Sequence, residues 1–501
     1  MFVLFPQLNK FGEPKLFIFA LLMGTVENIG LMFCLAFAAW MVRVWAGVLF
    51  IVSGIASFFI KNLGIEITKP IIESVFGTYP QEAADLMSVD LAAHLLLYAG
   101  IPIVLTFFLR IKKEPFLKRL KIFFITVTLM IPFYLVPHLM DPKSLIFAGK
   151  KLVEPYFVPT SLYRNTYGFL KKRVLKGSIA LEQRQRIEEV YAFEFDRQPK
   201  DMTFVLVIGE STRGDHLSLN GYERTTTPKL EKRSNLVSYT DATSCSARTI
   251  FSVACLLSHK TLSTFSMPLS DTSVISVMKS LGFKTYFISN HRKKGRSNCE
   301  EADVCFMQAE KNKALGNTKQ AKYDLALLDL MASPTEEEGN KFIVLHTIGS
   351  HSNYNDRIPD ESYRKFRPTC ERASLYRCES DELVNSYDNS ILYVDTVLDS
   401  LMERLEDKNA FVLYTSDHGE SLGEKGVYLH SKPNFLAPSE QRDIPMLLWK
   451  SKAARITEDH AQRIKKKTLD EPVTHDHVFH TILDCSGVRG EIVDKKLSLC
   501  N

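Results

Sequence analysis

Three stretches of the chain decide its fold: FVLVIGEST at residues 204–212, FIVLHTIGSH at 342–351 and FVLYTSDHGES at 411–421. Each is a short apolar run, rich in β-branched and aromatic residues, that changes abruptly into residues able to bind metal ions or phosphate. Runs of this length and composition predict buried parallel strands rather than helices. Ligand sites in open α/β sheets lie beyond the carboxyl ends of the strands. We therefore expect the polar residues after the runs to converge at one edge of a sheet: Glu210, His346, His351, Asp417 and His418.

The residues after the third run indicate a metal site. Asp417, His418 and Glu420 stand within four positions, and Glu210 follows the first run in the same way. An acidic residue after a strand is most often a turn or a helix cap, so each has an ordinary interpretation when taken alone. Carboxylates and an imidazole gathered at one sheet edge are typical ligands of a divalent metal ion. We therefore predict a metal centre there.

The region from residue 201 to the end alternates short apolar runs with helical patterns. Further strands are predicted at 282–289 (GFKTYFIS) and 444–450 (IPMLLWK), and an amphipathic helix at 386–405. A polar helix at 179–191 is predicted to lead into the first strand. This alternation predicts a mostly parallel sheet with helices on both faces, and its length is ample for one large core.

The first 145 residues differ from the rest because they are apolar and sparsely charged. Four segments approach the ~20 residues needed to cross a bilayer: 16–40, 44–60, 91–109 and 122–140. The basic loop at 110–121 favours the cytoplasm, and the acidic loop between the second and third spans favours the outer side. The chain after residue 140 then lies on the outer side of the inner membrane. Counting four spans back from there places the N-terminus on the outer side as well. The net charge of +5 gives no case for nucleic-acid binding.

Residues 146–200 form a predicted connector between a membrane domain (1–145) and an outer domain (201–501). The connector mixes aromatic residues such as Tyr167 with basic residues such as Lys171. That composition suits a segment at the level of the lipid headgroups, where aromatic rings bury and cations meet anionic lipid. An ordinary tether with scattered aromatic residues is the alternative.

The cysteines support this topology. Eight of the nine lie in the outer domain, in four pairs that are close in sequence. Such spacing is typical of small disulfide loops in an oxidising compartment, and the sequence has no CxxC pair that would suggest a metal site instead. The bacterial periplasm fits best. The candidate disulfides join Cys245 to Cys255, Cys299 to Cys305, Cys370 to Cys378, and Cys485 to Cys500.

Four segments carry a family resemblance: VIGESTRGDHLSLNGYERTTTP at 207–228, SCSARTIFSVAC at 244–255, HTIGSH at 346–351 and SDHGESLGEKGVYLH at 416–430. Together they resemble the bacterial phosphoethanolamine transferases of the alkaline phosphatase/sulfatase superfamily, whose best-known members modify lipid A. The resemblance extends over nearly the whole chain but is loose in the spans. It implies an inner-membrane enzyme with a periplasmic catalytic domain, resistance to polymyxin, and five spans with a cytoplasmic N-terminus, one span more than the four identified.

By the same resemblance, the chain uses zinc as its cofactor and acts as a transferase. Phosphatidylethanolamine is the implied donor, lipid A the implied acceptor and membrane lipids the surroundings, and we expect a monomer. The family's zinc ligands match Glu210, Asp417 and His418, with the nucleophile Thr249 as the fourth group, and its substrate-binding histidines match His351 and His430.

The nucleophile segment departs most from the family pattern. The family usually reads SCGT-x-T-x-x-SVPC, whereas this chain has Ser246 for glycine, Ala247 for threonine and Ala254 for proline, with Arg248 at the open position before Thr249. The spacing from Cys245 to Thr249 is unchanged, so Thr249 is the predicted nucleophile. Thr243, Ser244 and Ser246 compete for this role, and each could instead cap the helix that follows.

A threonine hydroxyl is a weak nucleophile at neutral pH and needs activation by a base or a metal. We predict that Thr249 attacks the phosphorus of phosphatidylethanolamine, expels diacylglycerol and forms a phosphoethanolamine–threonine intermediate, which the acceptor then attacks. Lipid A phosphate, lipopolysaccharide core, periplasmic glucan and a surface protein are all acceptors that this chemistry allows.

Three other functions are alternatives. A sulfatase would need C/S-x-P-x-R, which the sequence from Cys245 to Arg248 does not match. A glycerolphosphate polymerase shares the fold and the threonine but does not usually carry such disulfides, and a non-enzymatic membrane anchor would be expected to lose a metal ligand. Among the other histidines, His346 is either a supporting residue of the site or a core residue, while His475 and Asp476 are expected to cap a helix.

Overall fold

The computed structural model describes residues 39–65, 87–108, 160–176 and 181–500, together with scattered residues within 67–75 and 115–128. The last long range has short gaps at 268, 292–297, 373, 435, 455–461 and 464–465. Contacts divide the chain into two compact units. The first, the N-terminal unit, is Met1–Leu175 with Lys425–Val427, and the second, the α/β unit, is Lys176–Glu424 with Tyr428–Asn501.

The N-terminal unit contains two helical stretches suited to a membrane. Helix α2 (Ala39–Leu63) is continuous, whereas α5 (Val89–Leu95) continues through a π-helical turn, η2 (Leu96–Gly100), into α6 (Ile101–Phe108). Residues 43–63 and 89–108 are long and apolar enough to cross a bilayer, and they cover the second and third predicted spans. The first and fourth predicted spans, 16–40 and 122–140, lie almost wholly outside the described residues.

The two stretches pack closely at a glycine of α2. A Cβ atom on Gly54 would lie 3.0 Å from Leu95 Cδ2, so glycine allows the close approach. Nearby, Ser57 Oγ and His94 Nε2 are hydrogen-bonded at 2.9 Å. The unit also contains helix α9 (Thr160–Lys176), which covers much of the predicted connector.

The polar helix predicted at 179–191 is wrong. The described part of that segment has a 3₁₀ turn at Leu181–Gln183 and a single helical turn, α10 (Ile187–Val190). The backbone of Gln185 is engaged elsewhere, because its N–H donates to Ser270 O and its carbonyl accepts from Thr272 N–H. A continuous helix would need those groups for its own ladder.

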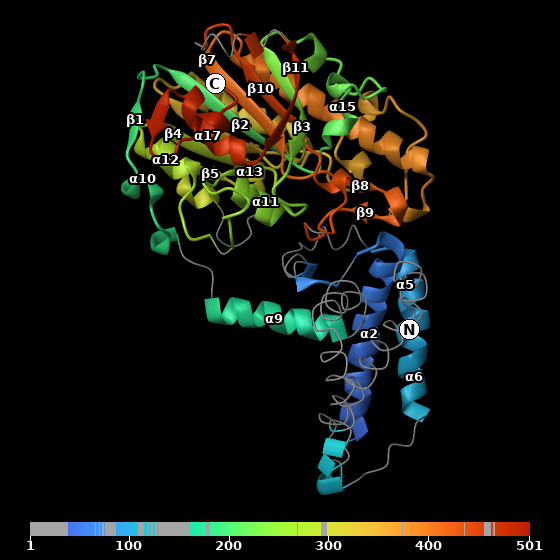
Figure 1. The fold of residues 1–501 in the computed structure, drawn as a ribbon. Coiled ribbons are helices and arrows are strands. Elements are labelled where there is room, and N and C mark those ends of the chain that lie inside the picture. The colour runs from blue at the N-terminus through green and yellow to red at the C-terminus, as the bar shows by residue number, and fades with distance from the viewer. Residues whose placement is uncertain are drawn as a thin grey trace. The chain divides into compact units, whose positions relative to one another are not determined.

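A sheet of eight strands forms the centre of the α/β unit (Figure 1). Every neighbouring pair is parallel except the two pairs made by β10, which runs antiparallel to β3 and to β7. The predicted mostly parallel sheet is therefore confirmed. The order across the sheet is β11 (Thr468–Thr474), β3 (Leu236–Thr243), β10 (Met446–Lys450), β7 (Asn409–Ser416), β2 (Met202–Gly209), β6 (Lys341–His346), β4 (Lys284–Ser289) and β5 (Val304–Phe306).

Helices cover both faces of this sheet, as the sequence predicts. Side chains alternate along a strand, so Phe204 and Leu206 of β2 pack into one core while Val205 and Val207 pack into another. The first core includes residues of α11 (Thr249–Leu256), α12 (Val274–Ser280) and α17 (Asp476–Cys485), and the second includes residues of α14 (Leu325–Glu336) and α15 (Ser380–Leu405).

The sequence missed several strands. β3 and β11 lie at one side of the sheet, and β11 alternates exposed and buried residues without a continuous apolar run. β1 (Phe193–Phe195) pairs antiparallel with β12 (Val488–Gly490), so part of the predicted connector packs with the α/β unit. Strands this short or this polar have too few apolar residues to show the run or the alternation from which a strand is predicted.

All four predicted cysteine pairs are disulfides in the structure, and each closes a short loop of the α/β unit. The Cys245–Cys255 bridge joins the loop after β3 to α11, which begins at Thr249. It therefore fixes the segment that carries the predicted nucleophile. The other three bridges join Cys299 to Cys305, Cys370 to Cys378, and Cys485 to Cys500.

Candidate metal centre and active site

The predicted acidic ligands leave the sheet side by side. β2 and β7 are parallel neighbours in register, with Gly209 opposite Ser416, so the next residues are Glu210 and Asp417. Asp417 N–H donates to Gly209 O (2.9 Å), and the loop after β6 supports the other side, where Ser350 N–H donates to Glu210 O (2.9 Å). Strand register therefore fixes both carboxylates at the carboxyl edge of the sheet.

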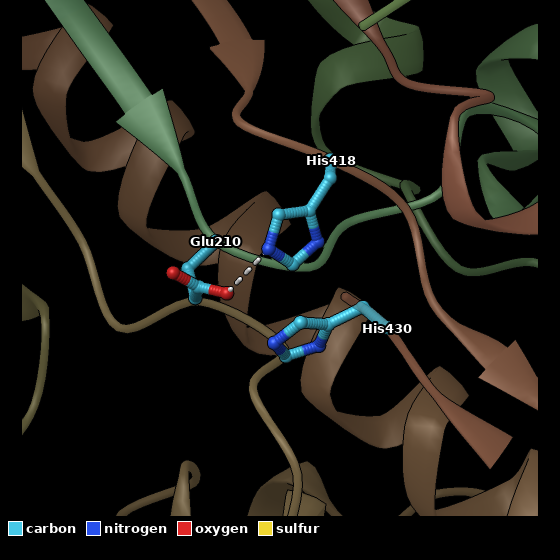
Figure 2. Close-up of side chains that lie close together, drawn as sticks. All are labelled: Glu210, His418 and His430. Carbon is cyan, nitrogen blue, oxygen red and sulfur yellow. Dashed lines mark ion pairs between the residues drawn. The ribbon is translucent and has the colours of Figure 1, made fainter. Parts of the chain in front are cut away.

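His418 presents one ring nitrogen to both carboxylates, and Figure 2 shows that nitrogen facing Glu210. Its Nδ1 lies 2.8 Å from Gly419 O, an atom that can only accept, so Nδ1 carries the proton and Nε2 keeps its lone pair. Nε2 lies 3.4 Å from Glu210 Oε1 and 3.2 Å from Asp417 Oδ2. A hydrogen bond from the far nitrogen to a carbonyl is how metal-binding histidines are usually oriented.

Thr249 is the first residue of α11, and its hydroxyl joins the cluster. Thr249 Oγ1 lies 3.3 Å from Glu210 Oε2 and 3.2 Å from His418 Nε2. Two of the competing hydroxyls are engaged or enclosed elsewhere: Ser244 Oγ donates to Ser246 O, and Ser246 itself is buried. Of the candidate nucleophiles, Thr249 is the one whose hydroxyl bonds to the cluster.

Burial makes this cluster unfavourable without a cation. It raises the pKa of Glu210 to about 8, with a further contribution from the neighbouring Asp417, and it raises the pKa of Asp417 to about 7. Burial also lowers the pKa of His418 to about 4, so its imidazole is neutral at physiological pH. Two ionised carboxylates in this space would repel each other and lack water, which a metal ion would correct.

The donor atoms fit zinc. Asp417 Oδ1 accepts two backbone N–H bonds, but Oδ2 is buried and has no hydrogen-bond partner. His418 Nε2 lies 3.2 to 3.4 Å from an oxygen of each of the other three groups, and Thr249 Oγ1 lies 3.3 Å from Glu210 Oε2. Tetrahedral zinc, with bonds of about 2.0–2.1 Å, needs donors about 3.3 Å apart. Among the described residues, Glu210, His418 and His430 each offer a ligand atom within 4.8 Å of the other two. Asp417 and Thr249 add an oxygen each at 3.2 Å from His418 Nε2, and the role of Glu210, Asp417, His418 and Thr249 as zinc ligands stays a prediction.

His351 and His430 lie beside this cluster, as expected of substrate-binding residues. The ring centroid of His430 lies 4.1 Å from the ring centroid of His418 and 5.6 Å from that of His351. Figure 2 shows His430 facing Glu210 and His418 from the neighbouring loop. Burial lowers the pKa of His351 well below its usual value, so this side chain is a neutral hydrogen-bonding group.

Glu420 was grouped with the metal site in the sequence, but the structure gives it a different position. Its Oε2 lies 2.7 Å from His430 Nδ1, and its Oε1 accepts a hydrogen bond from Tyr354 OH (3.1 Å). Burial raises the pKa of Glu420 to about 8. Glu420 thus orients His430, and only its place in the SDHGE segment hinted at a role.

Sequence reasoning assigned no role to His291, which lies near Glu210. His291 Nε2 is 3.8 Å from Glu210 Oε2, and its ring stacks on that of His346 at 4.0 Å. His346 ends β6, is buried, and burial lowers its pKa well below the usual value. It therefore lines the site rather than the distant core. A histidine two residues after a predicted strand, β4, was the available signal for His291.

The helix-capping role predicted for His475 and Asp476 is wrong. Neither the side chain of His475 nor that of Asp476 caps α17, because Thr474 Oγ1 accepts the N–H of Asp476 (3.2 Å) instead. Asp476 Oδ1 accepts from Leu262 N–H (2.9 Å), which ties α17 to the loop after α11.

Comparison with known proteins agrees with this geometry. The family model described as sulfatase matches residues 202–488, and the model described as phosphoethanolamine transferase EptA/EptB matches residues 28–174. Phosphoethanolamine transferase EptA of Salmonella typhimurium is 30% identical over 482 residues, covering 91% of this chain and 84% of the relative. The chain belongs to the phosphoethanolamine transferase family. It has the family's sulfatase-like fold, and it is an inner-membrane protein whose catalytic domain lies in the periplasm.

Other members of the family extend the comparison. The integral membrane lipooligosaccharide phosphoethanolamine transferase A of Neisseria meningitidis superposes with a TM-score of 0.84 at 23% identity, covering 99% of this chain and 95% of that structure. The Kdo(2)-lipid A phosphoethanolamine 7''-transferase of Salmonella typhimurium is 34% identical over 295 residues, 57% of this chain and 52% of the relative. The periplasmic domain of EptC from Escherichia coli, solved with zinc, has a TM-score of 0.51 at 25% identity and covers 62% of this chain and 89% of that structure.

Proposed function

We propose that this transferase moves phosphoethanolamine from phosphatidylethanolamine to a phosphate group of lipid A through a covalent intermediate on Thr249, with zinc as its cofactor. The proposal rests mainly on the position of the Thr249 hydroxyl, 3.2 Å from His418 Nε2 and 3.3 Å from Glu210 Oε2. A relative that acts on Kdo(2)-lipid A and a relative solved with zinc support the acceptor and the cofactor.

In the first half-reaction Thr249 Oγ1 attacks the phosphorus of the donor. Its proton passes to Glu210 Oε2, to which it already donates, and the bond from phosphorus to the diacylglycerol oxygen breaks. Thr249 begins α11, so the positive end of that helix favours the negative charge that develops there. Zinc, when bound, would lower the pKa of the hydroxyl and stabilise charge on the phosphate oxygens.

His430 is placed to supply the proton for the departing oxygen. Its Nδ1 is hydrogen-bonded to the Glu420 carboxyl group, and a proton shared between these two groups lets the ring give up the proton on Nε2. His351, a neutral imidazole beside it, would donate a hydrogen bond to a non-bridging phosphate oxygen. In the second half-reaction an acceptor P–OH oxygen attacks phosphorus and its proton passes to His430 Nε2, which restores that group. The bond from phosphorus to Thr249 Oγ1 breaks, and Glu210 returns its proton to Oγ1.

The donor is a membrane lipid, and helix α9 suits the same surface. Tyr167 is 67% exposed and Leu170 and Lys171 are exposed as well, so aromatic, aliphatic and basic groups stand together on one helix. We place this helix at the headgroup level of the membrane.

The test uses the full-length protein with vesicles of phosphatidylethanolamine. The wild-type chain should acquire one phosphoethanolamine on the tryptic peptide containing Thr249, Thr249→Ala should acquire none, and Thr249→Ser should retain it. Lipid A added afterwards should take up the group and regenerate the free enzyme. An adduct without transfer would overturn lipid A as the acceptor, and turnover by Thr249→Ala would overturn the nucleophile.

A further inference from the structure

His475 is a buried histidine close to the site that neither the zinc cluster nor the phosphate-binding pair uses. It is 1% exposed and directly precedes α17. Its Nε2 lies 2.9 Å from Ser416 O, an atom that can only accept, so Nε2 carries the proton. Its Nδ1 then accepts the N–H of Cys245 at 3.2 Å. Both ring nitrogens are used, and the two bonds select a single neutral tautomer.

The two partners of His475 belong to different parts of the catalytic apparatus. Ser416 is the last residue of β7 and precedes Asp417, whereas Cys245 lies four residues before Thr249. β3, which leads to Cys245, and β7, which leads to Asp417, are not neighbours, because β10 lies between them. The strand ladder therefore does not pair the nucleophile segment with the segment of the metal ligands, and the imidazole spans that gap.

Ser252, which lies one turn into α11, also connects the Thr249 segment to the Asp417 segment. Its hydroxyl donates to Asp417 O and lies 3.2 Å from His475 Nδ1. The ring of His475 thus contacts the loop before Thr249, the helix that Thr249 begins and the strand end that carries Asp417.

We propose that His475 is a positioning residue, which holds the Thr249 hydroxyl at its distance from Asp417 and His418 without touching zinc or substrate. This inference rests on the proposed role of Thr249 as the nucleophile. A shift of even 1 Å between a nucleophile and the groups that activate it costs about 100-fold in rate. Loss of His475 should therefore slow the formation of the adduct while leaving zinc content and donor binding in place.

A matched control lies in α17, the helix that His475 directly precedes. His480 is also buried, at 4% exposed, and its Nδ1 also accepts a backbone N–H, that of Asp494 at 3.1 Å. Asp494 belongs to the loop after β12, which carries none of the candidate site residues. His480→Asn therefore reproduces the loss of a buried imidazole in α17 without altering the link between Thr249 and Asp417.

The experiment compares His475→Gln, His475→Asn, His475→Ala and His480→Asn in the full-length protein, with thermal unfolding and zinc content measured first. Glutamine can keep the donor toward Ser416 O, and asparagine can keep the acceptor toward Cys245 N–H. The single-turnover rate of adduct formation on Thr249 should fall about 10–100-fold in each conservative His475 variant, as for supporting residues of metal sites, and further in His475→Ala. KM and zinc content should stay within about twofold, and His480→Asn should keep its rate within about threefold.

The outcomes separate this inference from the proposed function. An adduct rate in the folded His475→Gln and His475→Asn proteins equal to that of His480→Asn would overturn the positioning role. Loss of zinc in step with the rate would also overturn it. If His475→Ala does not fold, the two conservative variants decide the question. A wild-type protein that forms no adduct at Thr249 would instead overturn the proposed nucleophile itself.

Discussion

Two buried aspartates in the α/β unit show how a structural carboxylate differs from a functional one. Asp388, in α15, is saturated by its own chain: His216 Nδ1 lies 2.7 Å from Oδ1, while Arg224 (2.7 Å) and Tyr222 OH (3.1 Å) donate to Oδ2. Asp417 is buried to the same degree, yet its Oδ2 has no hydrogen-bond partner and faces His418 Nε2.

This difference indicates what the residues around each carboxylate do. A buried carboxylate must be paired, and Asp388 obtains its partners from the SLNGYER segment, at 218–224, and from His216 just before it. That segment, one of the most specific parts of the family resemblance, therefore holds the scaffold rather than the reacting groups. Asp417 keeps one oxygen without a protein donor, which makes sense if a cation supplies the missing charge.

The largest expected effect comes from replacing the Asp417 carboxylate by an amide. Asp417→Asn should lose zinc, and adduct formation should fall at least about 1,000-fold, because a bound metal supplies several kcal/mol of stabilisation to the transition state. Inductively coupled plasma mass spectrometry and the single-turnover assay measure the two quantities. Asp388→Asn is the matched control, which should unfold more easily by about 3 kcal/mol yet bind zinc fully when folded. Equal zinc loss in both variants would break the comparison.

A smaller effect is expected where a carboxylate acts through a histidine. Glu420 accepts from both Tyr354 and His430, and Glu420→Gln cannot accept both bonds with a single oxygen. We expect kcat to fall about 10–100-fold with zinc retained, since His430 loses its orientation and its counter-charge. Glu424→Gln, four residues further along the chain but paired with Arg213, is the control and should change kcat little. A zinc-free Glu420→Gln protein would place Glu420 among the metal ligands instead.

A further expected effect, which needs no substitution, is the dependence of zinc binding on pH. Burial raises the pKa of Asp417 to about 7 and of Glu210 to about 8, so both carboxyl groups must release protons when zinc binds. His418, with its pKa lowered to about 4, is already neutral and releases none in this range. Zinc affinity should rise with pH, by about tenfold per unit for each proton released, and level off above pH 8. Calorimetry in two buffers with different ionisation heats counts these protons, and a flat profile from pH 6 to 8 would contradict the burial argument.

The same pKa shifts determine whether the stability of the metal-free protein rises or falls with pH. Folded Glu210 and Asp417 hold their protons to higher pH than in the unfolded chain, where they ionise at their ordinary values. At a pH between a group's pKa in the unfolded chain and its pKa in the folded chain, the folded state binds more protons. The contribution of these two groups to stability therefore falls as pH rises toward 8.

Much of the site was predictable because its residues follow strands directly. Glu210 and Asp417 each come after an apolar run, and the rule that ligands bind at carboxyl ends brings them together without further knowledge. The disulfide pairs were predictable for a similar reason, since short sequence separations leave few ways to pair them. Thr249 was harder, because a loop separates it from β3 and three other hydroxyls competed for its role.

Other features had no sequence signal of their own. The position of β10 between β3 and β7, antiparallel to both, depends on connections that an apolar run does not encode. His475 lies 230 residues from Cys245 in sequence, so their hydrogen bond could not be inferred from spacing. A lone histidine before a helix is more simply explained as a cap, and the tertiary fold overrode that interpretation.

The sequence by itself determined the strands of the central sheet that carry the site, the mostly parallel arrangement, the oxidised cysteines and the set of candidate metal-binding residues, because each depends on local periodicity or on residues next to a strand end. Only the tertiary structure decided that Asp417 keeps an unpaired oxygen while Asp388 is saturated, that Glu420 contacts His430, and that His475 joins the nucleophile segment to β7. Those outcomes depend on which distant groups share one buried space, and the cost of burying an unpaired charge is set there rather than along the chain.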